Sequence, residues 1–246
     1  MPHVSLAAEK ISSLFGLTVT NSLLATWLTM ALLFIFTWLA TRRLSLHPTG
    51  AQTLAEIVVG GLYDFFQQVT GENVKKFFPL AASLFLFILV SNWMGLLPGV
   101  GTIGFFHHAH GQEVMTPLFR APTADLNTTI ALALITVFAI QYFGFRALGF
   151  HYTGRFIILN SPIMFAVGIL ELVSEIAKII SFGFRLFGNI FAGEVLLTVI
   201  AFLIPFVAPL PFLAMELFIG MIQALVFSML FAVFAQIAVS HGEEHS

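Results

Sequence analysis

Apolar residues along the chain fall into five long blocks, separated by shorter polar stretches. The blocks cover residues 22–41, 78–98, 126–148, 164–204 and 211–240. A helix of about 20 apolar residues crosses the hydrocarbon core of a bilayer, so each block predicts a membrane-spanning helix. The fourth block is about twice that length, which predicts a helix that is steeply tilted, bent or both.

Two further segments have one apolar and one polar face. In the N-terminal segment, residues 1–21, a helix would place Glu9 opposite an apolar face made of Val4, Ala7, Ile11 and Leu14. No basic region leads into a cleavage site there, so we expect a short interfacial helix rather than a signal peptide. The amphipathic segment from Thr53 to Val69 predicts a second helix lying at the membrane surface.

Loop composition predicts the connections and the orientation. The stretch IPFVAPLPF (204–212) is rich in proline, which predicts a helical hairpin over 164–240 within a single membrane domain, 1–246. Five crossings place on one side the cations Arg42, Arg43, Lys75, Lys76, Arg146 and Arg155. The other side holds only Lys10 and Arg120. The positive-inside rule therefore predicts an outer N-terminus and a cytoplasmic C-terminus.

Composition agrees with this pattern. The chain is 59% hydrophobic and 9% charged, with mean hydropathy +0.98, whereas a soluble domain is about a quarter charged. We therefore expect an all-α integral membrane protein with about five transmembrane helices plus interfacial helices. The net charge of −2 argues against a nucleic-acid partner, and the absence of cysteine excludes disulfides. No GxxxxGK stretch is present, so we expect no nucleotide site of its own.

The fourth block carries most of the ionisable side chains found inside the apolar blocks. At about 100° per residue, an arc of about 80° contains Glu171, Ser174, Lys178, Ser181, Arg185 and Asn189. Glu194 points roughly the opposite way, about 13 Å further along the helix. In the last block, Glu216 and Gln223 are seven residues apart and share a face. Neither Glu194 nor Glu216 has a basic neighbour at helical spacing.

Arg185 is the polar residue in this region that is hardest to explain as structural. A charge at the centre of a membrane helix costs roughly 2.5–3.5 kcal/mol, and Arg185 has no acid three or four residues away. Its partner must come from another helix or another subunit. Glu175 and Lys178, by contrast, have the spacing of a structural ion pair.

Other polar residues have simpler interpretations. Asp125 stands before Asn127 where a helix begins, which is typical of an N-cap. His107, His108 and His110 are expected in a solvated outer loop, with a metal site as the less favoured alternative.

Four stretches of this chain resemble subunit a of the F-type ATP synthase, a resemblance that runs from about Glu56 to Gln236. They are SFGFRLFGNIFAGE (181–194), PTADLNTT (122–129), SNWMGLLPG (91–99) and GMIQALVFSMLF (220–231). The resemblance implies a stator subunit with two aqueous half-channels, which carry protons to and from a rotating ring of c subunits and so couple the gradient to ATP synthesis. The two long helices would form the hairpin that faces this c-ring.

The resemblance also implies a role for each matching residue. Arg185 corresponds to the essential ion-translocation arginine that faces the ring. The outer half-channel would contain Asn189, Glu194, Glu216 and Gln223, with Asp125 and Asn127 near its mouth. The inner half-channel would contain Glu171, Ser174, Lys178 and Ser181. The family often pairs a histidine with a glutamate across the long helices, whereas here both positions, Glu194 and Glu216, are acidic.

The implied partners are the c-ring, b-type peripheral stalk subunits and, indirectly, the nucleotide-hydrolysing sector, in the lipid of a bacterial inner membrane. No cofactor is expected, and the transported ion is a proton, with sodium left open. A stand-alone secondary transporter is the alternative, although such proteins usually contain an internal repeat, which this sequence does not show. A structural scaffold is the third hypothesis.

Overall fold

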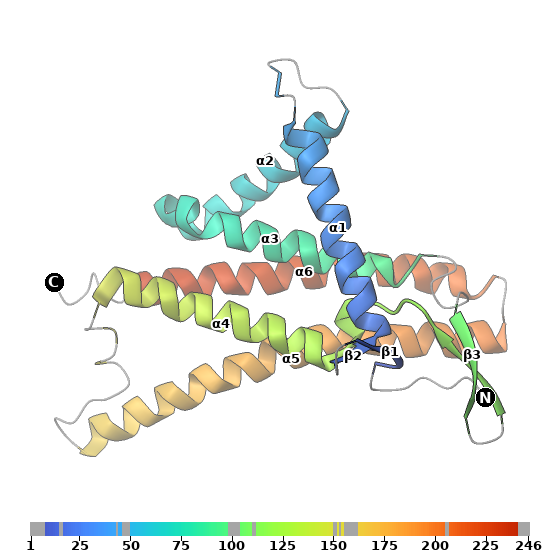
Figure 1. Ribbon diagram of the computed structural model, residues 1–246. Helices are drawn as coiled ribbons and strands as arrows, with labels where there is room; N and C mark the ends of the chain where they lie inside the picture. The colour runs from blue at the N-terminus through green and yellow to red at the C-terminus, as the bar shows by residue number, and fades with distance from the viewer. Residues whose placement is uncertain are drawn as a thin grey trace.

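The computed structural model describes residues 8–14, 17–42, 44–45, 50–97, 104–109, 112–149, 152, 154, 162–204 and 207–240. Its long helices are α1 (Asn21–Thr41), α2 (Ala51–Thr70), α3 (Val74–Met94), α4 (Leu126–Leu148), α5 (Pro162–Leu203) and α6 (Pro209–Ser240) (Figure 1). Two single-turn 3₁₀ helices are η1 (Gly71–Asn73) and η2 (Pro122–Ala124). Two short hairpins are β1 (Lys10–Leu14) with β2 (Leu17–Thr20), and β3 (Gly104–Ala109) with β4 (Gln112–Pro117).

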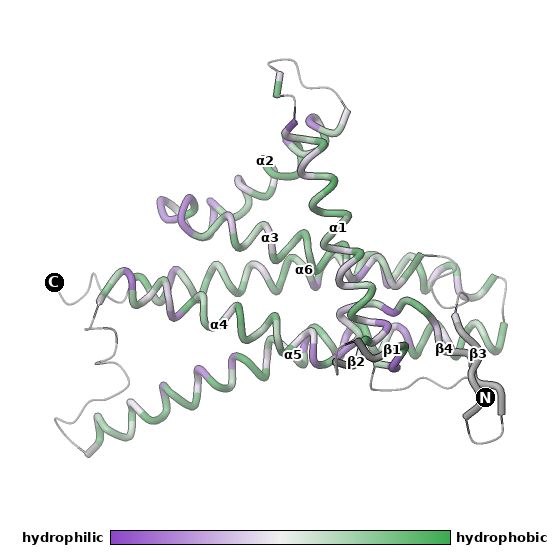
Figure 2. Tube along the Cα trace, in the orientation of Figure 1, coloured by the Kyte–Doolittle hydropathy of each residue, from purple (hydrophilic) through white to green (hydrophobic). Residues whose placement is uncertain are grey.

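The prediction of five membrane spans is confirmed. Among the described residues, five helical segments are long and apolar enough to cross a membrane: Asn21–Thr41, Ala51–Met94, Leu126–Leu148, Ile163–Leu203 and Pro209–Ser240. Each contains one of the predicted apolar blocks or nearly all of it. Figure 2 shows that apolar residues dominate along these helices. The chain is therefore a multi-pass, predominantly helical membrane protein.

The prediction of a helix near the N-terminus is wrong for the residues that the structure describes. Lys10–Leu14 is a strand that pairs antiparallel with Leu17–Thr20. Thr18, Val19 and Thr20 are β-branched and favour strands, whereas a single short amphipathic helix is marginal on its own. Val4 and Ala7, which belong to the predicted apolar face, lie outside the described residues. The helix predicted from Thr53 to Val69 is present as α2.

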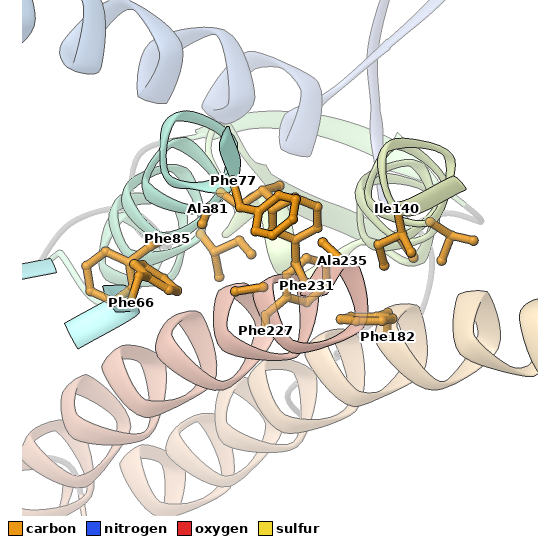
Figure 3. Close-up of a cluster of buried hydrophobic side chains, with 14 of the residues drawn as sticks. Phe66, Phe77, Ala81, Phe85, Ile140, Phe182, Phe227, Phe231 and Ala235 are labelled. Carbon is orange, nitrogen blue, oxygen red and sulfur yellow. The ribbon is translucent and has the colours of Figure 1, made fainter. Parts of the chain in front are cut away.

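Aromatic side chains fill the core where α3, α4 and α6 meet (Figure 3). Phe77 of α3 and Phe231 of α6 are buried there, and Phe77 packs edge-on against Phe143 of α4 with ring centroids 5.1 Å apart. Phe182 of α5 makes a similar contact with Phe227 of α6 at 4.9 Å. These contacts fix α6 between α3 and α5, so side chains on one face of α6 meet α5.

Helix α5 is longer than a bilayer is thick. Its 42 residues correspond to about 63 Å of straight helix, against about 30 Å of hydrocarbon. Figure 1 shows that α5 changes direction: its first half diverges from α6, and its second half lies alongside α6. The same view places β3 towards the end at which α5 and α6 meet, whereas β1 and β2 lie nearer the middle of these two helices.

Candidate functional site

The polar stripe of α5 lies on the surface of the chain. Ser174, Ser181, Arg185 and Asn189 are exposed, and Glu171 and Lys178 are partly exposed. The buried residues of the same helix, including Phe182, Leu186 and Ile190, lie on other faces of the helix. The six predicted residues of the stripe therefore share one accessible side of α5, as their spacing predicts, and this side is left for water or for another protein.

Arg185 occupies an exposed place in this stripe. Its Nη2 donates a hydrogen bond to Ser181 Oγ at 3.4 Å, which links two predicted site residues one turn apart. The ion pairs formed among the described residues do not include Arg185. Phe184 beside it is 53% exposed, so the surrounding surface is apolar. The permanent charge of Arg185 is thus presented outward, and no acid of the described chain neutralises it.

Lys178, by contrast, is neutralised within the chain. Its Nζ lies 2.8 Å from Glu175 Oε1, which confirms the predicted ion pair at i,i+3 spacing. The same nitrogen lies 4.8 Å from the ring centroid of Phe234 on α6, a cation–π contact. Lys178 therefore attaches the stripe of α5 to α6.

The predicted outer residues meet where the second half of α5 runs beside α6. The side-chain amide of Asn189 donates a hydrogen bond to Gln223 Oε1, which joins the two helices. Near the α5–α6 connection, Glu216 lies over Gly193, and a Cβ atom at Gly193 would overlap its carboxylate. Glu216 is 5% exposed, and among the described residues it has no hydrogen bond or ion pair. A buried acid thus lies directly against the backbone of α5.

Glu194 is paired with a residue that sequence reasoning did not select. Arg120 donates to Glu194 Oε2 from Nε at 3.1 Å and from Nη2 at 3.0 Å. The guanidinium also lies 5.9 Å from the ring centroid of Phe191. The side chain of Arg120 is 5% exposed and that of Glu194 is 34% exposed. The sequence counts Arg120 only as an outer loop charge, because its partner is 74 residues away.

Both acids and Arg120 line one cavity of about 210 Å³. Its wall includes Asn92 of α3, Thr198 of α5 and Pro117 at the end of β4. The volume is sufficient for several water molecules, which need polar partners of this kind. Residues from four parts of the chain therefore form a partly enclosed space whose wall contains both polar and apolar side chains.

Hydrogen bonds from Asn92 and Trp93 attach α3 to α6 beside this cavity. Asn92 Nδ2 donates to the carbonyl oxygen of Gly220 at 2.8 Å, and its Oδ1 accepts from the Thr123 hydroxyl at 2.6 Å. Trp93 Nε1 donates to the carbonyl oxygen of Leu217 at 3.1 Å. These residues belong to the SNWMGLLPG and PTADLNTT stretches, and they hold the turn of α6 that carries Glu216.

The predicted N-cap at Asp125 is confirmed. Its Oδ1 accepts the backbone N–H of Asn127 at 3.1 Å and the Asn127 side-chain amide at 3.3 Å. Asp125 is buried and Asn127 is exposed, and neither lines the cavity. His107 and His108 lie in β3, and His110 falls outside the described residues, so the metal-site alternative stays a hypothesis.

Comparison with known proteins identifies the family. Residues 23–236 match the family described as ATP synthase A chain. The chain is 36% identical over 214 residues to ATP synthase subunit a of Geobacter sulfurreducens, covering 86% of this chain and 84% of that protein. It is 36% identical over 239 residues to the sodium ion specific ATP synthase subunit a of Propionigenium modestum, covering 96% and 80%. It is 33% identical over 230 residues to the Moorella thermoacetica subunit a, covering 94% of each. Because these matches span nearly the whole chain, and the stretches behind the resemblance form its core contacts and its polar site, the protein belongs to the ATP synthase subunit a family.

Proposed function

We propose that this chain is the stator that moves the coupling ion through the membrane sector, by way of two half-channels that meet a ring of c subunits. The observation that carries the proposal is Arg185, an outward-facing cation on a membrane helix without an acid partner among the described residues. The free-energy cost of placing its charge in an apolar environment would be offset by an ionised carboxylate on the rotor. A partner that carries such a carboxylate fits this face of α5.

The outer half-channel in this proposal contains Glu194, Glu216, Asn189 and Gln223, with Asp125 and Asn127 near its mouth. The cavity that Glu194 and Glu216 share supports grouping these two acids, and a hydrogen bond links Asn189 to Gln223. A rotor carboxylate must be neutral while it faces lipid, because ionised it would be heavily desolvated. A proton arriving from outside neutralises it and lets it rotate away from the stator.

The inner half-channel contains Glu171, Ser174, Lys178 and Ser181, on the accessible side of α5. A rotor carboxyl that returns after nearly a full turn releases its proton there, towards Glu171. The resulting carboxylate is attracted to Arg185. Because a guanidinium does not give up its proton in a protein, Arg185 prevents direct proton passage between the two half-channels.

The proposed setting is a bacterial inner membrane with the N-terminus outside and the C-terminus in the cytoplasm. Arg42 ends α1, Lys75 begins α3 and Arg146 lies in the last turn of α4, so alternating crossings bring these cations to one side. The relatives named above are bacterial proteins. Partners would be the c-ring, b-type stalk subunits and, through them, the nucleotide-hydrolysing sector.

Substitution of Arg185 tests the proposal in the assembled enzyme reconstituted into vesicles. Arg185→Ala should abolish ATP-driven ion uptake, measured for both H⁺ and Na⁺, while the subunits still co-purify. Arg185→Lys should also function poorly, because lysine lacks the planar fork and can lose its proton. Arg146→Ala is the matched control: it removes an exposed arginine at the end of α4 and should leave uptake near normal. Normal coupled uptake with Arg185→Ala would contradict the proposal.

A further inference from the structure

The two acids of the outer cavity have unequal surroundings. Arg120 holds the Glu194 carboxylate with two hydrogen bonds of 3.0 and 3.1 Å. Glu216 lines the same cavity, is 5% exposed and has no cationic partner among the described residues. One acid therefore has its charge balanced by a fixed cation, and the other does not.

This difference decides which acid can change its protonation state. Two charge-assisted hydrogen bonds favour the ionised form of a carboxylate and oppose the desolvation that favours its neutral form, and protonation would leave a buried guanidinium without its counter-charge. A buried carboxyl group without a cation tolerates its neutral form well, because burial penalises the charged form, so it can hold a proton that a paired carboxylate does not. Two acids in one cavity therefore acquire separate roles.

We propose that Arg120 holds Glu194 as a fixed carboxylate, and that Glu216 is the acid of this pair that takes up and releases the transported proton. This inference rests on the proposed outer half-channel and refines it. A proton from the outer side binds a Glu216 carboxylate oxygen, and the same O–H bond breaks when the proton passes to the rotor carboxylate. The Arg120–Glu194 pair stays neutral throughout, so the net charge of the three groups alternates between −1 and 0.

The remaining groups around the cavity are compatible with this division. The other polar side chains that line it, Asn92 and Thr198, are uncharged. Glu9, just before β1, is a further acid close enough to Glu194 to act on it electrostatically. Gly193 lets the Glu216 carboxyl lie against α5, where a larger residue would displace it. Arg120 is thus a positioning residue, and Glu216 is the residue that carries the proton.

Four variants of the assembled ATP synthase in vesicles test the assignment: Glu216→Gln, Glu194→Gln, Arg120→Gln and the double variant Arg120→Gln with Glu194→Gln. ATP-driven proton uptake is measured with a pH-sensitive dye, and co-purification of the subunits confirms assembly. Glu216→Gln should reduce uptake at least tenfold. Each single change at the ion pair should also reduce it, because one charge loses its partner. Proton uptake by the double variant should be at least threefold higher than uptake by either of these two single variants, since the double variant replaces an ion pair with a neutral hydrogen-bonding pair.

The dependence of proton entry on the outer pH separates positioning from a purely structural role. In Arg120→Gln, loss of the cation should strengthen proton binding by the acids, so the midpoint of the curve of proton entry against outer pH should move to higher pH. In the double variant, this midpoint should return towards that of the unmodified protein. If the double variant is as defective as Glu216→Gln, Glu194 itself carries the proton and the inference is wrong. If Glu216→Gln and Glu194→Gln both pump normally, the outer half-channel assignment fails as well, which distinguishes the two failures.

Discussion

Gly193 is the residue at which the packing of α5 controls the position of an acid. Its lack of a side chain leaves the space that the Glu216 carboxylate occupies. Gly60 in α2 provides a contrast, because a Cβ there would meet no atom within 4 Å. The two glycines are both helical, but only the first supports a site residue directly.

Gly193→Ala should therefore displace Glu216 and impair pumping. Overpacking of this kind costs typically about 1–3 kcal/mol, which outweighs the gain in helix propensity of up to ~1 kcal/mol. We expect a several-fold fall in ATP-driven ion uptake and a lower unfolding temperature of the detergent-solubilised complex. Gly60→Ala should leave uptake unchanged and stability equal or slightly higher. Equal behaviour of the two variants would mean that Glu216 has room to move without loss.

At this scale the sequence predicts the interactions that are local in the chain. Asp125 with Asn127 and Glu175 with Lys178 are two and three residues apart, so helical geometry alone indicates them. Arg120 and Glu194 are 74 residues apart, and their pairing depends on how the segment before η2 folds over α5. No periodicity in the sequence carries that information. An intramembrane acid without a local base was the available signal that a distant partner exists.

Helix α5 has two sides that differ in chemistry. Its stripe of Ser174, Ser181 and Arg185 is exposed and polar, whereas Leu172 and Ile179 line an apolar cavity of about 230 Å³ with Val137 of α4. The part of the stripe with Glu171, Ser174, Lys178 and Ser181 is proposed as a wall of the inner half-channel, whereas the second side lies towards α4. The two sides should therefore differ in access to water.

Single cysteines test this difference, since the natural chain has no cysteine. Cysteines at Ser174 and Ser181 should react with water-soluble thiol reagents added from the cytoplasmic side of the assembled enzyme. Cysteines at Leu172 and Ile179 should react at least several-fold more slowly, because they lie against α4 or lipid. Labelling rates are measured by mass shift or by a fluorescent maleimide. Similar labelling rates at all four positions would mean that the stripe is not a channel wall and that its charged residues have a structural role.

The helices themselves were predictable because burial in lipid imposes a simple rule on composition. Runs such as 126–148 need only be long and apolar, and α4 covers the same residues. The hairpin Lys10–Leu14 with Leu17–Thr20 was not predicted, because strand pairing is settled by contacts between segments rather than by the period of one segment. The bend of α5 was anticipated from length alone, as one of two ways to fit it in a bilayer.

The whole molecule exposes its proposed ion-translocation residues on its surface. In the proposed function it therefore works only together with other subunits. The face with Arg185 is exposed, and its apolar surroundings, such as Phe184 and Ile180, are more than half exposed. In the proposed function each half-channel ends at the rotor. Neither one crosses the bilayer alone.

Vesicles that contain this chain alone should consequently show no proton or sodium conductance above that of empty vesicles when a potassium diffusion potential is applied. Addition of the c-ring and stalk subunits should establish conductance, measured by a dye for proton entry or by tracer sodium. Vesicles with the other subunits but without this chain are the control. Substantial flux through the isolated chain would favour the stand-alone transporter instead.

The length of α5 determines how far apart the two proposed half-channels lie in the plane of the membrane. Glu171 and Glu194 are separated by 23 residues, about 35 Å along the helix axis. If the whole of α5 lay within about 30 Å of hydrocarbon, its path of about 63 Å, averaged over the change of direction, would descend about half an ångström per ångström of its length. The two acids then differ by about 17 Å in depth but by about 30 Å sideways. In the proposed function, that lateral offset would convert ion flow into torque: channels stacked vertically would only leak, whereas displaced ones oblige the rotor to turn.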